Sequence, residues 1–252
     1  MSCGPLKTWS VLVTVLGDLC TAPQDQVEGR VVTALMDGMG INSQAVRVAL
    51  HRLRRDGWIE STKTGRSACY SLTSAGWNQT QAVRPQIYSA AAAPKRDIWL
   101  AVAPAGIAQS ETDGVFPKDS VMIAPRTALT LVSPNENPAH LLLSPLEAKS
   151  VPKWAAEIVI GEKTLIEYNV LAESVRQILN QRPPADLFQR TVLRMLILHQ
   201  WRRLRLRHGD LPDAVLTSDW PGAKARDAIA LALTTFARPS LQQVRDACQI
   251  MA

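Results

Sequence analysis

Four long polar side chains recur at spacings of three and four between residues 43 and 55. They are Gln44, Arg47, His51 and Arg55. In a helix with about 3.6 residues per turn, this spacing places all four on one face. An arginine fork matches O6 and N7 of guanine, and a glutamine amide matches N6 and N7 of adenine. The stretch therefore predicts a helix whose exposed face can contact base edges in the major groove.

The opposite face of this stretch is apolar and predicts the side that packs against a core. It consists of Val46, Ala49, Leu50 and Leu53. Asn42 and Ser43 offer an N-cap before the helix, and Gly57 is placed to end it. Val48, Arg52 and Arg54 flank the polar stripe.

The neighbouring segments supply the elements that would position this helix. Leu6 to Leu19 and Val27 to Met36 predict two helices, and a glycine-rich turn leads from the second to Asn42. After Gly57, two short strands at 58–61 and 68–72 enclose a polar tip with basic residues, which is typical of a hairpin. The order predicts a winged helix-turn-helix, with the hairpin as a wing that contacts phosphate or the minor groove. The candidate DNA-binding residues are Ser43, Gln44, Arg47, His51, Arg52, Arg54, Arg55, Lys63, Thr64 and Arg66.

A basic helix face can also be merely solvated, and that reading fits Arg52, Arg54 and Arg55 when each is taken singly. The succession of helix, helix, turn, basic helix, glycine and basic-tipped hairpin favours DNA binding instead.

The composition of the 252 residues agrees with a folded chain of two or three domains. Apolar residues make up 46% and charged residues 20%, which excludes a disordered or fibrous protein. The net charge of +6 indicates an anionic partner. This charge is uneven: residues 1–85 carry +3, residues 86–180 carry −2 and residues 181–252 carry +5. The basic balance therefore does not by itself locate a nucleic-acid site.

Four single cysteines, with no CxxC pair and no histidine at zinc spacing, predict a reduced, cytoplasmic protein without a disulfide framework, a metal or a cofactor. Lys7 and the apolar run Trp9 to Leu16 resemble the start of a signal peptide, but the run is short and Asp18 interrupts it. No other run approaches the ~20 apolar residues of a membrane span. We expect no membrane partner.

Two proline-containing breaks divide the chain, at residues 84–94 and at Arg182-Pro183-Pro184. The middle part predicts strands at 97–102, 120–124, 128–132, 140–143 and 154–160. A helix follows at 164–179, with Leu165, Val170, Leu171, Val175 and Leu179 facing inward. The chain is strongly helical from Asp186 onward. The expected fold class is α+β and multidomain.

Matches at both ends of the chain resemble the PaaX family, whose best-known members repress phenylacetic acid degradation genes in bacteria. Near the N-terminus they are Gly17-Asp18, Gly40-Ile41, Ala45-Val46-Arg47, Ala49-Leu50, Arg52-Leu53, Asp56-Gly57-Trp58, Gly65-Arg66 and Tyr70-Ser71-Leu72-Thr73. Near the other end they are His199-Gln200-Trp201-Arg202-Arg203, Asp210-Leu211-Pro212 and Asp219-Trp220-Pro221-Gly222.

The resemblance implies a winged-helix domain at 1–84, a linker at 85–94, a ferredoxin-like α/β domain at 95–182 and a helical domain at 183–252. It also implies a homodimeric repressor of a double-stranded DNA operator, released by an aryl acyl-coenzyme A. One departure stands out, because the stretch from Pro104 to Asp119 has little helical periodicity. The helix that a ferredoxin-like unit places there is expected to be short or missing.

Arginines also crowd the end of the predicted helix that contains Trp201. They either complement the helix dipole or hold the phosphates of a nucleotide-like effector, with a tryptophan stacked on its adenine ring. The candidate effector residues are Trp201, Arg202, Arg203, Arg205 and Trp220. Core packing is the competing role for both tryptophans.

Three functions compete at this point. The first is a dimeric, non-enzymatic repressor that binds a pseudopalindromic operator. The second is an acyl-coenzyme A-dependent enzyme or hydrolase that uses the winged helix for protein contacts, although no histidine lies in an HxxxD context and no GxSxG motif is present. The third is a protein that binds RNA, or nucleic acid without sequence preference.

Overall fold

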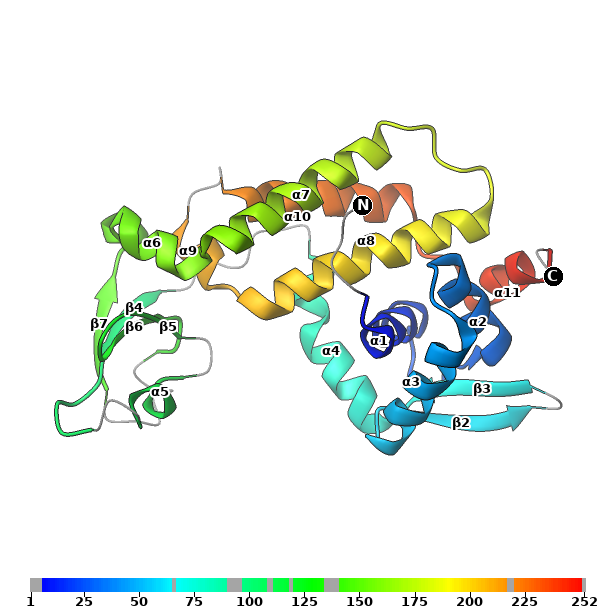
Figure 1. The fold of residues 1–252 in the computed structure, drawn as a ribbon, viewed down its shortest axis with the longest axis horizontal. Helices are drawn as coiled ribbons and strands as arrows, with labels where there is room; N and C mark the ends of the chain where they lie inside the picture. Colours follow the sequence, from blue (N-terminus) through cyan, green and yellow to red (C-terminus); the bar gives the residue numbers. More distant parts are fainter. Residues whose placement is uncertain are drawn as a thin grey trace. The chain divides into compact units, whose positions relative to one another are not determined.

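The computed structural model describes residues 6–64, 67–89, 97–107, 111–117, 120–133, 141–216 and 220–250. The chain folds into two compact units, and each combines segments that are distant in sequence (Figure 1). Unit 1 comprises Met1–Ser89, Glu173–Arg203 and Ala228–Ala252, and unit 2 comprises Ala90–Ala172 and Leu204–Asp227.

Unit 1 is built around α1 (Thr8–Leu19), which is buried on every side from Val11 to its end. The spacing of Leu12, Val15, Leu16 and Leu19 in the sequence accounts for only one apolar face. The remaining faces are buried as well because α1 packs against α3 (Ser43–Arg55) and shares a core with residues of α8 (Leu187–His208). Asp18 is therefore 0% exposed.

The segment after α1 differs in part from the prediction. Val27 and Glu28 form strand β1 and pair with β3 (Ser67–Leu72), so the second helix, α2, spans Gly29–Gly38. The predicted helical start at Val27 is wrong because these two residues are recruited by a distant strand. Gly40, with φ of 77°, makes the turn between α2 and α3.

A hairpin follows α3, as predicted, and a further helix follows the hairpin. β2 (Ile59–Thr64) pairs antiparallel with β3, in a sheet of order β1-β3-β2. Gly57, with φ of 72°, ends the helix and leads into β2. Thr73 caps α4 (Ser74–Tyr88), its hydroxyl accepting from the Gly76 N–H at 3.0 Å. Because α4 continues through Pro85, the predicted interdomain break begins inside a helix.

Unit 2 contains an antiparallel sheet of order β5-β6-β4-β7. Its strands are β4 (Ile98–Val102), β5 (Val121–Ala124), β6 (Thr127–Thr130) and β7 (Leu142–Leu146). Between β4 and β5, the described residues contain α5 (Thr112–Val115) of four residues, which agrees with the expected short helix. A 3-10 turn, η3 (Ala148–Ser150), follows β7.

The strand predicted at Trp154 to Ile160 is wrong: this segment is helix α6 (Lys153–Ile160). A short apolar run fits a strand or a buried helix equally well, and here Ala155 and Val159 are buried one turn apart. The next helix, α7 (Glu162–Leu179), is longer than predicted and buries Tyr168, whereas the predicted inward residue Val170 is 45% exposed.

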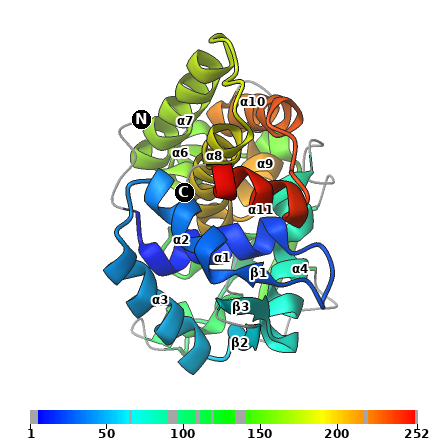
Figure 2. The same ribbon diagram turned by 90° about the vertical axis from the view of Figure 1, so that its right-hand side faces the viewer.

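The C-terminal half is helical, as expected. α8 is followed by α9 (Leu211–Val215), α10 (Pro221–Thr235) and α11 (Leu241–Ile250). Within unit 1, Figure 2 shows α11 beside α2, and Val244 and Cys248 join the core of the N-terminal helices. The boundaries 1–84, 85–94, 95–182 and 183–252 stay a prediction; residues 90–94 of the linker lie outside the described part. No described helix is both long and apolar enough to cross a membrane.

Candidate nucleic-acid interface

Helix α3 has the two faces that the sequence predicts. The apolar stripe is buried and joins the core of unit 1. Asn42 is the N-cap, its side-chain oxygen accepting from the Ala45 N–H at 2.9 Å. The exposed side chains are those of Ser43, Gln44, Arg47, Val48, His51, Arg52, Arg54 and Arg55. The seven polar residues predicted on this helix are thus brought together on one accessible surface.

The exposed side chains differ in how they are held. Arg47 donates from Nη2 to Gln44 Oε1 at 2.8 Å, so the glutamine orients the guanidinium and leaves other N–H groups of the fork for a ligand. Arg52 faces Asp56 at 3.4 Å and lies over the Trp9 ring, 5.6 Å from its centroid. These contacts draw Arg52 toward the rest of the protein.

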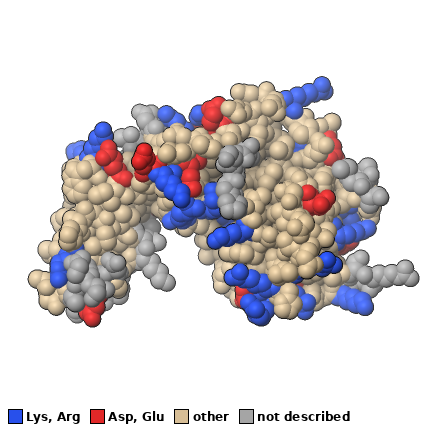
Figure 3. Space-filling model, viewed as in Figure 1, with Lys and Arg blue, Asp and Glu red and all other residues tan. Residues whose placement is uncertain are grey.

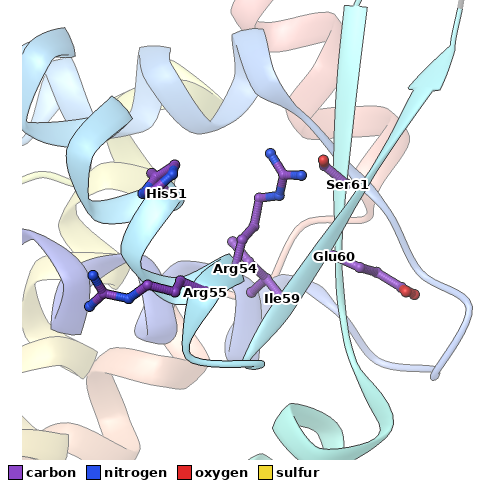
Figure 4. Close-up of a pocket in the computed structure, with 6 residues that line it drawn as sticks. All are labelled: His51, Arg54, Arg55, Ile59, Glu60 and Ser61. Carbon is purple, nitrogen blue, oxygen red and sulfur yellow. The ribbon is translucent and has the colours of Figure 1, made fainter.

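A shallow hollow separates the last turns of α3 from β2. It is lined by His51, Arg54, Arg55, Ile59, Glu60 and Ser61. Figure 4 shows Arg54 extended toward Ser61 of β2, whereas Arg55 extends away from the strand. Arg55 lies 3.3 Å from Asp56. Of these two arginines, Arg54 is therefore the one that points into the space between helix and hairpin.

The tip of the hairpin is described only in part. Lys63 is exposed on β2, and Thr64 pairs with Ser67 through the strand register. Arg66 lies outside the described residues. In Figure 3, Lys and Arg side chains gather along the lower edge of unit 1, over α3 and the start of the hairpin. The positive charge of these side chains suits the negatively charged phosphate backbone of DNA.

A buried ion pair lies behind this surface, and sequence reasoning missed it. Arg194 of α8 donates from Nε and Nη2 to Asp18 of α1, at 2.7 and 2.8 Å. Arg194 also donates to the carbonyls of Leu233 and Phe236, and Tyr88 of α4 donates to Asp18 at 2.8 Å. Burial and the neighbouring carboxylate raise the pKa of Tyr88. The available signal was a lone aspartate in an apolar helix, which requires a buried partner.

Two of the three predicted effector residues of unit 1, Trp201 and Arg202, make hydrogen bonds within the protein. Trp201 is 1% exposed and donates from Nε1 to the Ile87 carbonyl at 2.9 Å. Arg202 and Arg203 are half-buried, and Arg202 lies 3.5 Å from the Ser10 hydroxyl. Burial, reinforced by these two arginines, lowers the pKa of His199 to about 4. Core packing, the competing role, is what the structure shows for Trp201.

The predicted effector residues of unit 2 lie in a second buried polar cluster. Arg205 donates to Asp210 and faces Asp213 at 3.3 Å, while Arg226 donates to Asp213. Trp220 donates from Nε1 to Asp213 at 3.1 Å, and its ring meets the edge of Tyr168 with centroids 5.1 Å apart.

The tight packing also explains why residue 222 is a glycine, because a Cβ on Gly222 would overlap the indole ring of Trp220. Asp219, which precedes Trp220, lies outside the described residues. Among the described residues, no group of three His, Cys, Asp or Glu side chains could hold a metal ion.

Two family models match this chain. The model of the PaaX-like protein covers residues 7–76, which include α1, α3 and the hairpin, and that of the PaaX-like protein C-terminal domain covers residues 162–245. The chain belongs to the PaaX family.

Comparisons with individual proteins found further matches, among them the following two. The transcriptional repressor PaaX of Escherichia coli (strain K12) is 23% identical over 249 residues, which cover 88% of this chain and 78% of that protein. The structure of uncharacterized protein Rv0674 from Mycobacterium tuberculosis matches at 19% identity and a TM-score of 0.49. That match covers 97% of this chain and all of the other.

Proposed function

We propose that this PaaX-family protein is a transcriptional repressor that binds operator DNA through α3. The observation that carries the proposal is the division of one helix into a buried apolar stripe and an accessible face that presents four exposed arginines. Arg47, oriented by Gln44, is suited to guanine, and Arg54 points toward the hairpin. Membership of the PaaX family supports the same function.

We assign a winged helix-turn-helix to this region, with α2 and α3 as the two helices and the β2–β3 hairpin as the wing. Exposed Lys63 would contact the phosphate backbone and fix the register of α3. For the sheet of unit 2 we propose the ferredoxin-like plan, supported by its antiparallel order β5-β6-β4-β7 and by the short α5 after its first strand.

A single helix reads few base pairs, so the proposal includes a homodimer on a pseudopalindromic operator. Its two copies of α3 would enter successive major grooves on one side of the duplex. An acyl-coenzyme A-type effector would release the protein by favouring a dimer whose helices no longer match this spacing.

The contacts described above limit which of the candidate residues could bind the effector. Arg202 and Arg203 are half-buried, so of the five candidates these two would most readily contact a phosphate. Binding through Trp201, Arg205 or Trp220 would require their internal hydrogen bonds to open. Stabilisation of the protein by acyl-coenzyme A esters in a thermal-shift assay tests this point. If free coenzyme A and every ester leave the Tm unchanged, the effector is of another class.

Selection from a random duplex library with the full-length protein tests operator binding directly. We expect enrichment of a two-fold symmetric sequence whose half-sites are one or more helical turns apart. The affinity for this sequence should exceed that for a scrambled duplex and for the matching RNA duplex. Failure to enrich any sequence, or equal affinity for all three duplexes, would overturn the proposal.

A further inference from the structure

An apolar side chain lies within the polar face of α3. Val48 is 61% exposed, whereas the other exposed residues of the helix are polar or charged. Scattered apolar residues are normal on protein surfaces, so exposure alone does not mark a contact. The position of Val48 on the helix gives it a more specific meaning.

Val48 lies nearer to the middle of the exposed face than the arginine that we expect to read guanine. With about 100° per residue, Gln44, Val48 and His51 fall within an arc of about 60° opposite the buried stripe. Arg47 lies at about 60° to one side of Gln44. A duplex that meets Gln44 and Arg47 therefore also meets Val48.

Valine is a poor choice for this position unless something packs against it. Its branched Cβ lowers its helix propensity, and at 61% exposure the protein provides little packing in return. The same branching restricts χ1, so the two methyl groups are held in a fixed direction. The side chain is thus a rigid apolar surface flanked by hydrogen-bonding groups.

We propose that Val48 is a specificity-determining residue that packs against the C5 methyl group of a thymine. In the major groove, the thymine methyl is the apolar group that a base presents, beside the acceptors and donors that polar side chains read. The half-site would then hold a thymine next to the base pair read by Arg47. This inference rests on the proposed function.

The test removes the methyl group from the DNA and from the protein in turn. Each thymine of the duplex enriched by the full-length protein is replaced singly by uracil, which lacks only the methyl, and Kd is measured by fluorescence anisotropy. For the protein without substitutions, we expect one position per half-site at which uracil raises Kd about fourfold. The loss of one buried methyl contact predicts a change of this size. In Val48→Ala, the same replacement should change Kd less than about twofold, because the partner methyls are gone.

A matched control is Leu231→Ala, which truncates an exposed apolar residue of α10 in the same unit. It should retain the full uracil effect. Val48→Thr keeps one methyl and should retain part of it.

The inference is overturned if no thymine shows the effect, or if Val48→Ala retains it at every position. In both cases sequence-specific binding, and its loss in Arg47→Ala, would leave the proposed function standing. If the library yields no enriched sequence at all, both proposals fall together.

Discussion

Arginines serve opposite purposes in two regions of unit 1. On α3 the arginines are exposed and have few partners within the protein: Arg47 donates to Gln44, and Arg52 contacts Asp56 and the Trp9 ring. Behind α1, Arg194 is 3% exposed and donates to a carboxylate and to two carbonyls. The first arrangement leaves donors for a ligand, whereas in the second Nε, Nη1 and Nη2 each have a partner inside the protein. Burial and the number of internal partners, rather than residue type, separate an arginine with N–H groups open to a ligand from one that is part of the core.

Breaking the buried pair should have the largest effect on folding. Arg194→Ala removes both close arginine hydrogen bonds to the buried Asp18 carboxylate and leaves it with the Tyr88 hydroxyl and with Arg238 at 3.9 Å. Removing one partner of a buried ion pair costs about 3–5 kcal/mol of unfolding free energy. Denaturant unfolding measures this loss, with exposed Arg54→Ala as the matched control at less than about 0.5 kcal/mol. If the double variant Asp18→Leu/Arg194→Met regains most of the stability, the loss comes from the orphaned charge. Equal losses in the Arg194 and Arg54 variants would contradict the contrast between the two regions.

The second largest effect is expected from acid, which should lower the unfolding free energy through a buried histidine. His199 hydrogen-bonds to Thr14 at 3.1 Å, and burial lowers its pKa to about 4 from 6.5. The unfolded chain therefore binds the proton first, so the unfolding free energy falls as the pH drops from about 6.5 to about 4, by about 3 kcal/mol in total. Unfolding curves of the natural protein and of His199→Gln across this range measure the difference. A variant with the same pH slope as the natural protein would exclude His199 as its source.

On the exposed face, Arg47→Ala should leave folding unchanged and weaken operator binding by about 1–3 kcal/mol. Its preference for the enriched sequence over random duplex should also relax. Arg52→Ala is the control, because Arg52 is engaged by Asp56 and Trp9. An equal loss on specific and random duplex in the Arg47 variant would argue against base reading and would move that role to Gln44 or His51.

The smallest change is expected at the hairpin. Lys63→Ala should weaken all duplexes alike and reduce the slope of log Kobs against log salt by about 0.9, the value for one lost phosphate contact. Titration at several salt concentrations gives this slope. An unchanged slope would place Lys63 away from the backbone.

Helix α3 was predictable because its signals are local. The cap at Asn42, the apolar period and the positive φ of Gly57 all act within a few residues of α3. Local signals misled at two places, one where a distant strand pairs with the segment and one where a short apolar run fits a strand and a helix equally well. Val27 was assigned to a helix and lies in β1, and the run at Trp154 was assigned to a strand and is helical.

The sequence by itself determined the phase of α3, the hairpin after it and the family of the chain. Only the tertiary structure decided which charges are buried and with whom. Asp18 and Arg194 are 176 residues apart, and no periodicity relates them. Their pairing follows from the packing of α8 against α1. A buried carboxylate is costly unless it is paired with a cation, and the fold determines which cation lies close enough. The same packing turned Trp201 from a candidate stacking surface into a core residue whose N–H is already donated.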